Sequence, residues 1–376
     1  MGKKQHSLLF TTGIIYFVIL LLFIGVRITV QIVDFPISDE VLDYIASGII
    51  QIGFMFLLPI LAFSLMQKQK VKKTFTDFGY AKINFKSILV CILIGFFCYF
   101  LNILISSFFG TIIRLCGYEN PPSSATGSVG DYSVLAFILN VITVAILPAI
   151  CEETTHRGLL LKGFSTLGIK KAIIFSSLLF GLMHLNINQF FYATVLGFII
   201  ALTVIISKNI FPAIIIHFMN NFLSVYFDFA RHNNWFGKGL YEFFTTFLYS
   251  ENFISFFITN CLVLVVLLFT IVFLFTILLK ETRIKKVNNM LTDIAQINKE
   301  FNEGDPVYQN NPNLANLHNL NNLMKQYNIK SLNSMVFTDL EMKERRKSTL
   351  FEILLLVSCF VVSGLVTAFT FIWGII

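Results

Sequence analysis

The chain has 376 residues, of which 56% are hydrophobic and 13% are charged, about half the charged fraction of an ordinary soluble domain. So few charges cannot cover a water-exposed surface, and the composition therefore excludes a soluble globular protein. The net charge of +7 does not indicate nucleic-acid binding, because the lysines cluster beside apolar segments, where basic residues mark the cytoplasmic face of a membrane.

Uncharged stretches of about 20 residues recur along the chain, and this is the length that crosses a lipid bilayer as a helix. The first stretch follows Lys3 and Lys4, but it exceeds the apolar core of a signal peptide and no small-residue cleavage site follows it, so we expect a retained span. The pattern predicts an all-α, polytopic transmembrane helix bundle of about nine spans. The predicted spans are residues 8–30, 43–66, 87–113, 132–152, 171–186, 189–206, 210–229, 253–280 and 348–373.

The basic residues predict the orientation of this bundle. If nine spans alternate, the lysines and arginines at 3–4, 68–73, 157–171, 208 and 280–347 all fall on one side. Basic residues favour the cytoplasm. We therefore expect a multi-pass protein of the cell membrane with its N-terminus in the cytoplasm and its C-terminus outside.

Composition divides the chain into five parts. They are N-terminal transmembrane helices at 1–131, a helical core at 132–229, an interfacial segment and the eighth span at 230–281, a polar insert at 282–347, and the last span at 348–376. The insert is rich in Asn, and we interpret it as a small cytoplasmic unit of one or two helices, or as a partly disordered connector. It is also the candidate binding site for a protein partner.

Ionisable side chains inside membrane spans are costly, so they are candidates for function. Glu152 and Glu153 end the fourth predicted span, and Arg157 lies four residues after Glu153, one helical turn away. We expect Arg157 to neutralise one carboxylate and leave the other pointing into the bundle. The alternative is a charged helix terminus in water at the cytoplasmic interface.

Two later segments carry the other polar groups. His184 lies in an apolar helix without a local partner, and His217 and Asn221 lie on one helical face at i,i+4. Each histidine alone is explained by a packing hydrogen bond between helices. Together with a glutamate, two imidazoles and an amide supply what is needed to activate a water molecule and stabilise an oxyanion.

These residues also resemble a known family, the CAAX prenyl endopeptidases and bacteriocin-processing or self-immunity proteins, called the CPBP or Abi family of intramembrane proteases. Its motifs EExxxR, FxxxH and HxxxN resemble 152–157, 180–184 and 217–221, in that order. The resemblance implies that Glu152 is the general base, that His184 helps to position the water, and that His217 and Asn221 form the oxyanion hole. Glu153 and Arg157 would brace the site.

The resemblance implies an intramembrane endopeptidase that cleaves a membrane-associated peptide or protein, for example in peptide or bacteriocin maturation. The composition, with 43 Phe and many Asn, Lys and Ile residues, is typical of a low-GC bacterium and disfavours a prenylated substrate. We expect no cofactor. Zinc is an alternative, because Glu153 and His156 form a Glu-x-x-His unit, and Asn220 is an alternative to Asn221 as the amide.

Two other functions stay open from the sequence. A non-catalytic immunity or scaffold protein would keep the same residues as a polar packing cluster. A transporter would use them as an ion relay, although no internal repeat supports that architecture.

Overall fold

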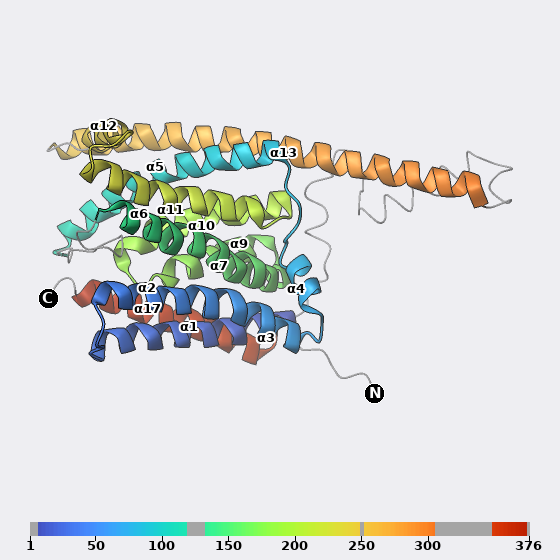
Figure 1. Cartoon of the computed structure of the whole chain (residues 1–376), viewed down its shortest axis with the longest axis horizontal. Helices are drawn as coiled ribbons and strands as arrows, with labels where there is room; N and C mark the ends of the chain where they lie inside the picture. The colour runs from blue at the N-terminus through green and yellow to red at the C-terminus, as the bar shows by residue number, and fades with distance from the viewer. Residues whose placement is uncertain (1–6, 119–131, 249–251, 305–347, 374–376) are drawn as a thin grey trace.

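The computed structural model describes residues 7–118, 132–248, 252–304 and 348–373. These residues form helices and contain no strand (Figure 1), which confirms the all-α bundle. Eight helical segments of the described chain are long and apolar enough to cross a membrane, as expected of a multi-pass membrane protein. They are α1 (Leu8–Ile32), Asp39–Met66, α5 (Phe85–Leu115), Val134–Leu167, α10 (Ile187–Ser207), α11 (Phe211–His232), Ile254–Thr282 and Leu350–Ile372.

The fifth predicted span differs from this set. It corresponds to α9 (Ile169–Met183), which has 15 residues and a length of about 22 Å, shorter than a hydrocarbon core of about 30 Å. A tight turn ends α9, with Leu185 in the left-handed region (φ 50°) and Asn186 accepting a hydrogen bond from the backbone of Asn188 at the start of α10. The described chain therefore has eight full-length candidates, and a short helix at the fifth of the nine predicted spans.

Two of the spans change their helical pitch along their length. Asp39–Met66 consists of α2 (Asp39–Gly48), the π-helix η1 (Ile49–Leu57) and α3 (Leu58–Met66). Val134–Leu167 consists of α6 (Val134–Asn140), the π-helix η2 (Val141–Ile146), α7 (Leu147–Glu153), a third π-helix η3 (Thr154–Leu160), α8 (Leu161–Phe164) and the 3₁₀ turn η4 (Ser165–Leu167). Such wide turns inside helices are frequent at functional sites.

Prolines account for the first two wide turns. Pro59 and Pro148 follow η1 and η2 directly, in the first turn of α3 and of α7. Proline has no N–H, and its ring clashes with the carbonyl four residues earlier, so Met55 and Val144 lose their ordinary helical partners. Both carbonyls accept hydrogen bonds from side chains of the candidate site instead, as described below.

The remaining helices lie at the edges of the bundle. α4 (Val71–Asp77) and α12 (Lys238–Leu248) are short connectors. α13 (Phe253–Gly304) continues for 52 residues and projects from one end of the bundle (Figure 1), so the first part of the predicted insert is helical. The rest of the insert, 305–347, lies outside the described residues, and the last helix is α17 (Leu350–Trp373).

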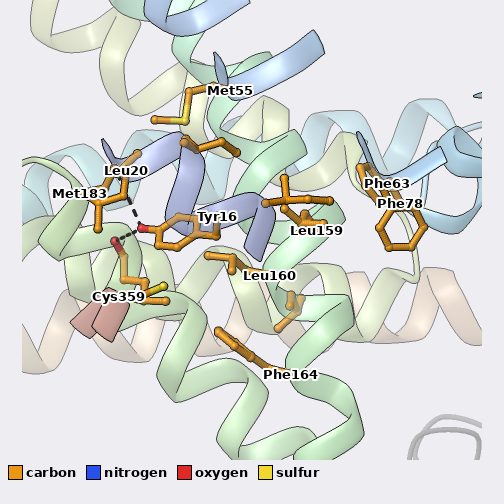
Figure 2. Packing of buried hydrophobic residues seen from close by; sticks show 14 of the residues in the cluster. Tyr16, Leu20, Met55, Phe63, Phe78, Leu159, Leu160, Phe164, Met183 and Cys359 are labelled. Carbon is orange, nitrogen blue, oxygen red and sulfur yellow. Dashed lines mark hydrogen bonds between the residues drawn. The ribbon is translucent and has the colours of Figure 1, made fainter. Parts of the chain in front are cut away.

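The buried apolar side chains form two clusters. One joins α1, the η1–α3 segment, η3, α8, α9 and α17, and the other joins α5, α10, α11 and α13. Figure 2 shows Tyr16 of α1 at the centre of the first cluster, beside Leu160, Met183 and Cys359, with its hydroxyl 3.2 Å from the carbonyl oxygen of Leu179. Many large apolar side chains elsewhere face outward, as a lipid-facing surface requires.

Candidate active site

The first motif lies in the interior of a helix. The fourth predicted span ended at 152, but the helical segment continues to Leu167, and the side chains of Glu153 and Arg157 are both 0% exposed. The prediction of that boundary was wrong, because the polar run 154–157 has the composition of a helix end while its side chains are satisfied inside the bundle. The alternative of a water-exposed terminus is therefore contradicted at Glu153 and Arg157.

Glu153 is the carboxylate that binds Arg157. Its Oε1 accepts hydrogen bonds from Arg157 Nη1 at 3.1 Å and from His217 Nδ1 at 2.8 Å. Arg157 also donates from Nη2 to the carbonyl of Gly197 on α10, at 3.0 Å. A buried charge is tolerated only when it is paired and hydrogen bonded, and the pairing of Glu153 with Arg157 is the one that their i,i+4 spacing predicted. Through His217 and Gly197 this ion pair also joins α7 and η3 to α11 and α10.

His217 and Asn221 meet on one face of α11. Because Nδ1 of His217 donates to Glu153, Nε2 is the acceptor, and it lies 3.1 Å from Nδ2 of Asn221. Nδ2 of Asn221 also donates to the carbonyl of Val144 at 2.9 Å. This is the carbonyl that Pro148 excludes from helical bonding, so the wide turn η2 supplies the acceptor that orients the amide.

Asn220 has a different place from Asn221. It donates from Nδ2 to Oδ1 of Asn221 at 2.9 Å, and its own Oδ1 accepts from the buried Asn102 on α5. Asn221 is thus the amide that contacts the imidazole, and Asn220 and Asn102 hold it from behind. Asn102 was not predicted as a site residue, and its one signal in the sequence is a lone amide in an apolar helix.

Phe180 brings the second motif to the same place. Its ring packs edge-on against His156, His184 and His217, with centroid distances of 5.0, 5.6 and 5.6 Å. The guanidinium of Arg157 lies over the ring at 4.4 Å. His184 follows the last residue of α9 and is half-buried, and Glu152 and His217 are close enough to act on it electrostatically.

Glu152 points to a different partner from Glu153. Its Oε1 accepts a hydrogen bond from Nε2 of Gln51 in η1, at 2.8 Å. Gln51 is 8% exposed, and its own Oε1 is buried without a partner among the described residues. Sequence reasoning missed Gln51, although a glutamine within an apolar run was the available signal. The two glutamates therefore have different partners, Glu153 in an ion pair with Arg157 and Glu152 hydrogen bonded to an uncharged amide.

The wide turn η3 is braced on both sides. Thr155 donates to the carbonyl of Met55 at 2.6 Å, which is the acceptor that Pro59 leaves free. Thr154 shares a 2.6 Å hydrogen bond with the hydroxyl of Tyr80, between α4 and α5. Burial raises the pKa of Tyr80 to about 12, so this hydroxyl stays neutral in the physiological range and keeps the hydrogen bond.

His156 does not join Glu153 in a ligand pair. Its Nδ1 donates to the backbone carbonyl of Glu152 at 2.9 Å, and its Nε2 is buried without a partner among the described residues. In that part of the chain, no group of three His, Cys, Asp or Glu side chains is arranged to hold a metal ion. The described donors therefore do not fit a zinc site, which needs at least three protein ligands.

The three motifs thus converge from α7, η3, α9 and α11 on one buried cluster. Over this same part of the chain, a family model matches. Residues 134–223 match the type II CAAX prenyl endopeptidase Rce1-like family. The match confirms the resemblance to the CAAX protease family and supports an intramembrane protease at the level of the family.

The match to the Rce1-like family spans α6 through most of α11. Gln51, Asn102 and the whole of α1 and α17 lie outside it. Comparison with curated proteins and with solved structures gives no match.

Proposed function

We propose that the protein is a glutamate-dependent intramembrane endopeptidase. The observation that carries this proposal is the division between the two adjacent carboxylates. Glu153 is committed to Arg157 and His217, whereas the carboxylate of Glu152 is hydrogen bonded, among the described residues, to the uncharged amide of Gln51. Glu152 is therefore the carboxylate that can take a proton from water.

In the proposed mechanism, Glu152 abstracts a proton from a water molecule while His184 orients that water toward a peptide carbonyl. The hydroxide attacks the carbonyl carbon, and the carbonyl oxygen becomes negatively charged. One N–H of Asn221 turns from Nε2 of His217 to donate to that oxygen, while the other stays on the carbonyl of Val144. The Glu153–Arg157 pair fixes the imidazole of His217 beside it. Glu152 then returns the proton to the leaving amine, and the peptide bond is broken.

The substrate class follows from where these groups lie. They belong to helices that cross or enter the membrane, so we propose a peptide or protein held at the membrane, as in bacterial peptide or bacteriocin maturation. The proposed orientation keeps the N-terminus in the cytoplasm. The proposal includes no metal ion.

The test compares peptides that accumulate in cells expressing the wild type, Glu152→Ala or His184→Ala, read by mass spectrometry. Removing a general base typically costs about 10²- to 10⁴-fold in rate, so products of the wild type should be absent in both variants. Glu242→Ala is the matched control, because Glu242 is a half-exposed carboxylate on α12 outside the site. Wild-type product levels in Glu152→Ala would refute the mechanism.

One observation favours a non-catalytic packing cluster as the second candidate. His217, Asn221, Glu153 and Arg157 are bonded mainly to one another and to backbone carbonyls. Glu152→Gln separates the two functions, because it keeps the size and the hydrogen bonding of the side chain and removes the base. Cellular function retained in Glu152→Gln would support the packing role.

A further inference from the structure

A cavity of about 1030 Å³ opens beside the candidate active site. It lies at the end of the bundle where α1 ends, between α1, α17 and the turn that joins α9 to α10. Its volume slightly exceeds the usual range for small-ligand pockets, about 300–1,000 Å³. The cavity is open on one side, because Arg27, Ile28, Leu365 and Phe369 in its wall are exposed. Its polar lining residues are Arg27, Gln31, Tyr118, His184, Asn186 and Thr370.

The cavity wall is contributed largely by elements outside the matched segment. α17 lies parallel to α1, because Glu352 at its start accepts a hydrogen bond from Ser7 at the start of α1, while the later parts of both helices line the cavity. Near the cavity, the ring of Phe371 stacks on Tyr118 at 5.7 Å, and Asn188 of α10 donates to the Tyr118 hydroxyl at 3.2 Å. α17 is therefore held in place as a wall.

His184 connects the cavity to the reacting groups. It is a lining residue, and its ring also packs against Phe180, which touches His217. A molecule in the cavity would therefore lie against the imidazole that is proposed to position the water.

Arg27 gives the cavity a positive charge. Its guanidinium lies 5.7 Å from the ring of Phe23, and no hydrogen bond or ion pair joins it to any described residue. It acts electrostatically on His184. The remaining walls are mostly aliphatic and aromatic, with Ile24, Ile28, Leu185, Leu365, Val366 and Phe369. A cation among apolar walls favours an apolar ligand that carries one anionic group.

We propose that this cavity binds an apolar peptide segment of the substrate, with a carboxylate of that peptide held by Arg27. The proposal rests on the proposed function in taking the ligand to be a peptide. The apolar side chains of α1 and α17 would contact the peptide on either side of the carboxylate. The neighbouring peptide bond would then extend past His184 toward Glu152.

The test measures binding to the full-length chain in phosphatidylcholine nanodiscs. The probes are six-residue peptides of Ala, Leu and Ile with an uncharged fluorophore at the N-terminus, in three forms. One form has a free terminal carboxylate, the second has a terminal amide, and the third has a terminal amide and an internal Glu. Binding is followed by fluorescence anisotropy on Glu152→Gln protein, so that turnover does not deplete the probe.

We expect at least one acidic form to bind about tenfold more tightly than the uncharged amide, because a hydrogen bond between charged groups strengthens binding by about this factor. Comparing the two acidic forms shows whether the cavity prefers a carboxylate at the chain terminus or one on a side chain. Adding Arg27→Gln should abolish the difference between acidic and uncharged peptides, and Arg27→Lys should retain part of it. Adding Arg114→Gln is the matched control, because Arg114 is an exposed cation near the end of α5 that does not line the cavity, and the preference should persist.

Equal affinity for acidic and uncharged peptides, or a preference that survives Arg27→Gln, would overturn the proposal. So would an anionic phospholipid seen by native mass spectrometry to be retained by Arg27 and lost from Arg27→Gln, because the cavity would then hold a lipid. Cleavage is measured separately on the wild type. Acid-selective binding without cleavage would refute the peptidase alone, and cleavage without acid selectivity would refute the cavity proposal alone.

Discussion

Gln51 shows how one side chain outside the motifs bears on the proposed base. It donates to Oε1 of Glu152 at 2.8 Å and leaves its own buried oxygen without a partner among the described residues. A buried acceptor without a partner costs free energy, and a water beside Glu152 would satisfy it. In the proposed mechanism, Gln51 would therefore both orient the carboxylate and hold the water that Glu152 is proposed to activate.

Replacing Gln51 by Leu should lower kcat by about 10- to 100-fold, because a hydrogen bond to a charged group is lost. KM should change little, since Gln51 does not line the proposed peptide cavity. The measurement is kcat and KM on a peptide identified from the wild-type products.

Gln67→Leu is the control. Gln67 lies just after α3 and donates to Thr11 at 2.7 Å, so its loss affects stability and leaves kcat of the folded protein unchanged. A wild-type kcat for Gln51→Leu would contradict this role.

Sequence spacing predicted the contacts that are local in the chain. Glu153 with Arg157 and His217 with Asn221 are separated by one helical turn, which fixes their proximity on any helix. The bond from Gln51 to Glu152 spans 101 positions and that from Asn102 to Asn220 spans 118. Their formation depends on how separate helices pack, and no local pattern encodes that packing.

The helical type of the elements was predictable, and so was the position of eight of the nine predicted spans, but the ends of the helices were less predictable. Apolar length located eight spans, but the boundary at 152 was wrong because Thr154, Thr155, His156 and Arg157 are buried. The wide turns were not predicted either. Two of them depend on Pro59 and Pro148, and on the side chains of Thr155 and Asn221, which donate hydrogen bonds to the freed carbonyls. These partners come from other elements, so a single helix considered alone does not reveal them.

Gly95 controls how closely α5 approaches α11. A Cβ at this position would lie 2.6 Å from Cβ of Met219 and 3.0 Å from the carbonyl oxygen of Ile216. Gly95→Ala should therefore move α11 outward, together with His217 and Asn221, and cost about 1–3 kcal/mol of stability. The melting temperature in detergent, followed with a thiol dye that reacts as buried cysteines become exposed, should fall, and peptide cleavage should fall with it.

Gly110→Ala is the control on the same helix, because nothing lies within 4 Å of its added Cβ. This variant should melt at the wild-type temperature or higher, since alanine favours a helix over glycine. If Gly95→Ala and Gly110→Ala change the melting temperature alike, the change comes from helix propensity, and the close approach of α5 and α11 does not limit the substitution.

In the whole molecule, the elements that carry the site belong to two apolar clusters. Apolar residues of η3 and α9 pack in one cluster, and those of α11 and most of those of α10 pack in the other. α1 starts at the end of the bundle from which α13 projects (Figure 1), and α17 runs parallel to α1. The start of α1 and the described part of the insert therefore lie at the same end of the bundle. The alternation of the predicted spans across the membrane had placed both on one side. The parallel packing of α17 on α1, and hence the cavity, could not be predicted, because it depends on contacts between the two ends of the chain.

The distribution of lysines predicts which end faces the cytoplasm. Cys116 follows α5 and is exposed, whereas Cys91, Cys98, Cys151 and Cys359 are buried, so a Cys261→Ser background leaves one reactive native thiol. A membrane-impermeant maleimide should label Cys116 in intact cells. In a background that also carries Cys116→Ser, Lys70→Cys, at an exposed position just before α4, should be labelled only after the cells are permeabilised. The reverse pattern would invert the bundle, place the Arg27 cavity on the cytoplasmic side, and require its peptide to arrive from the cytoplasm.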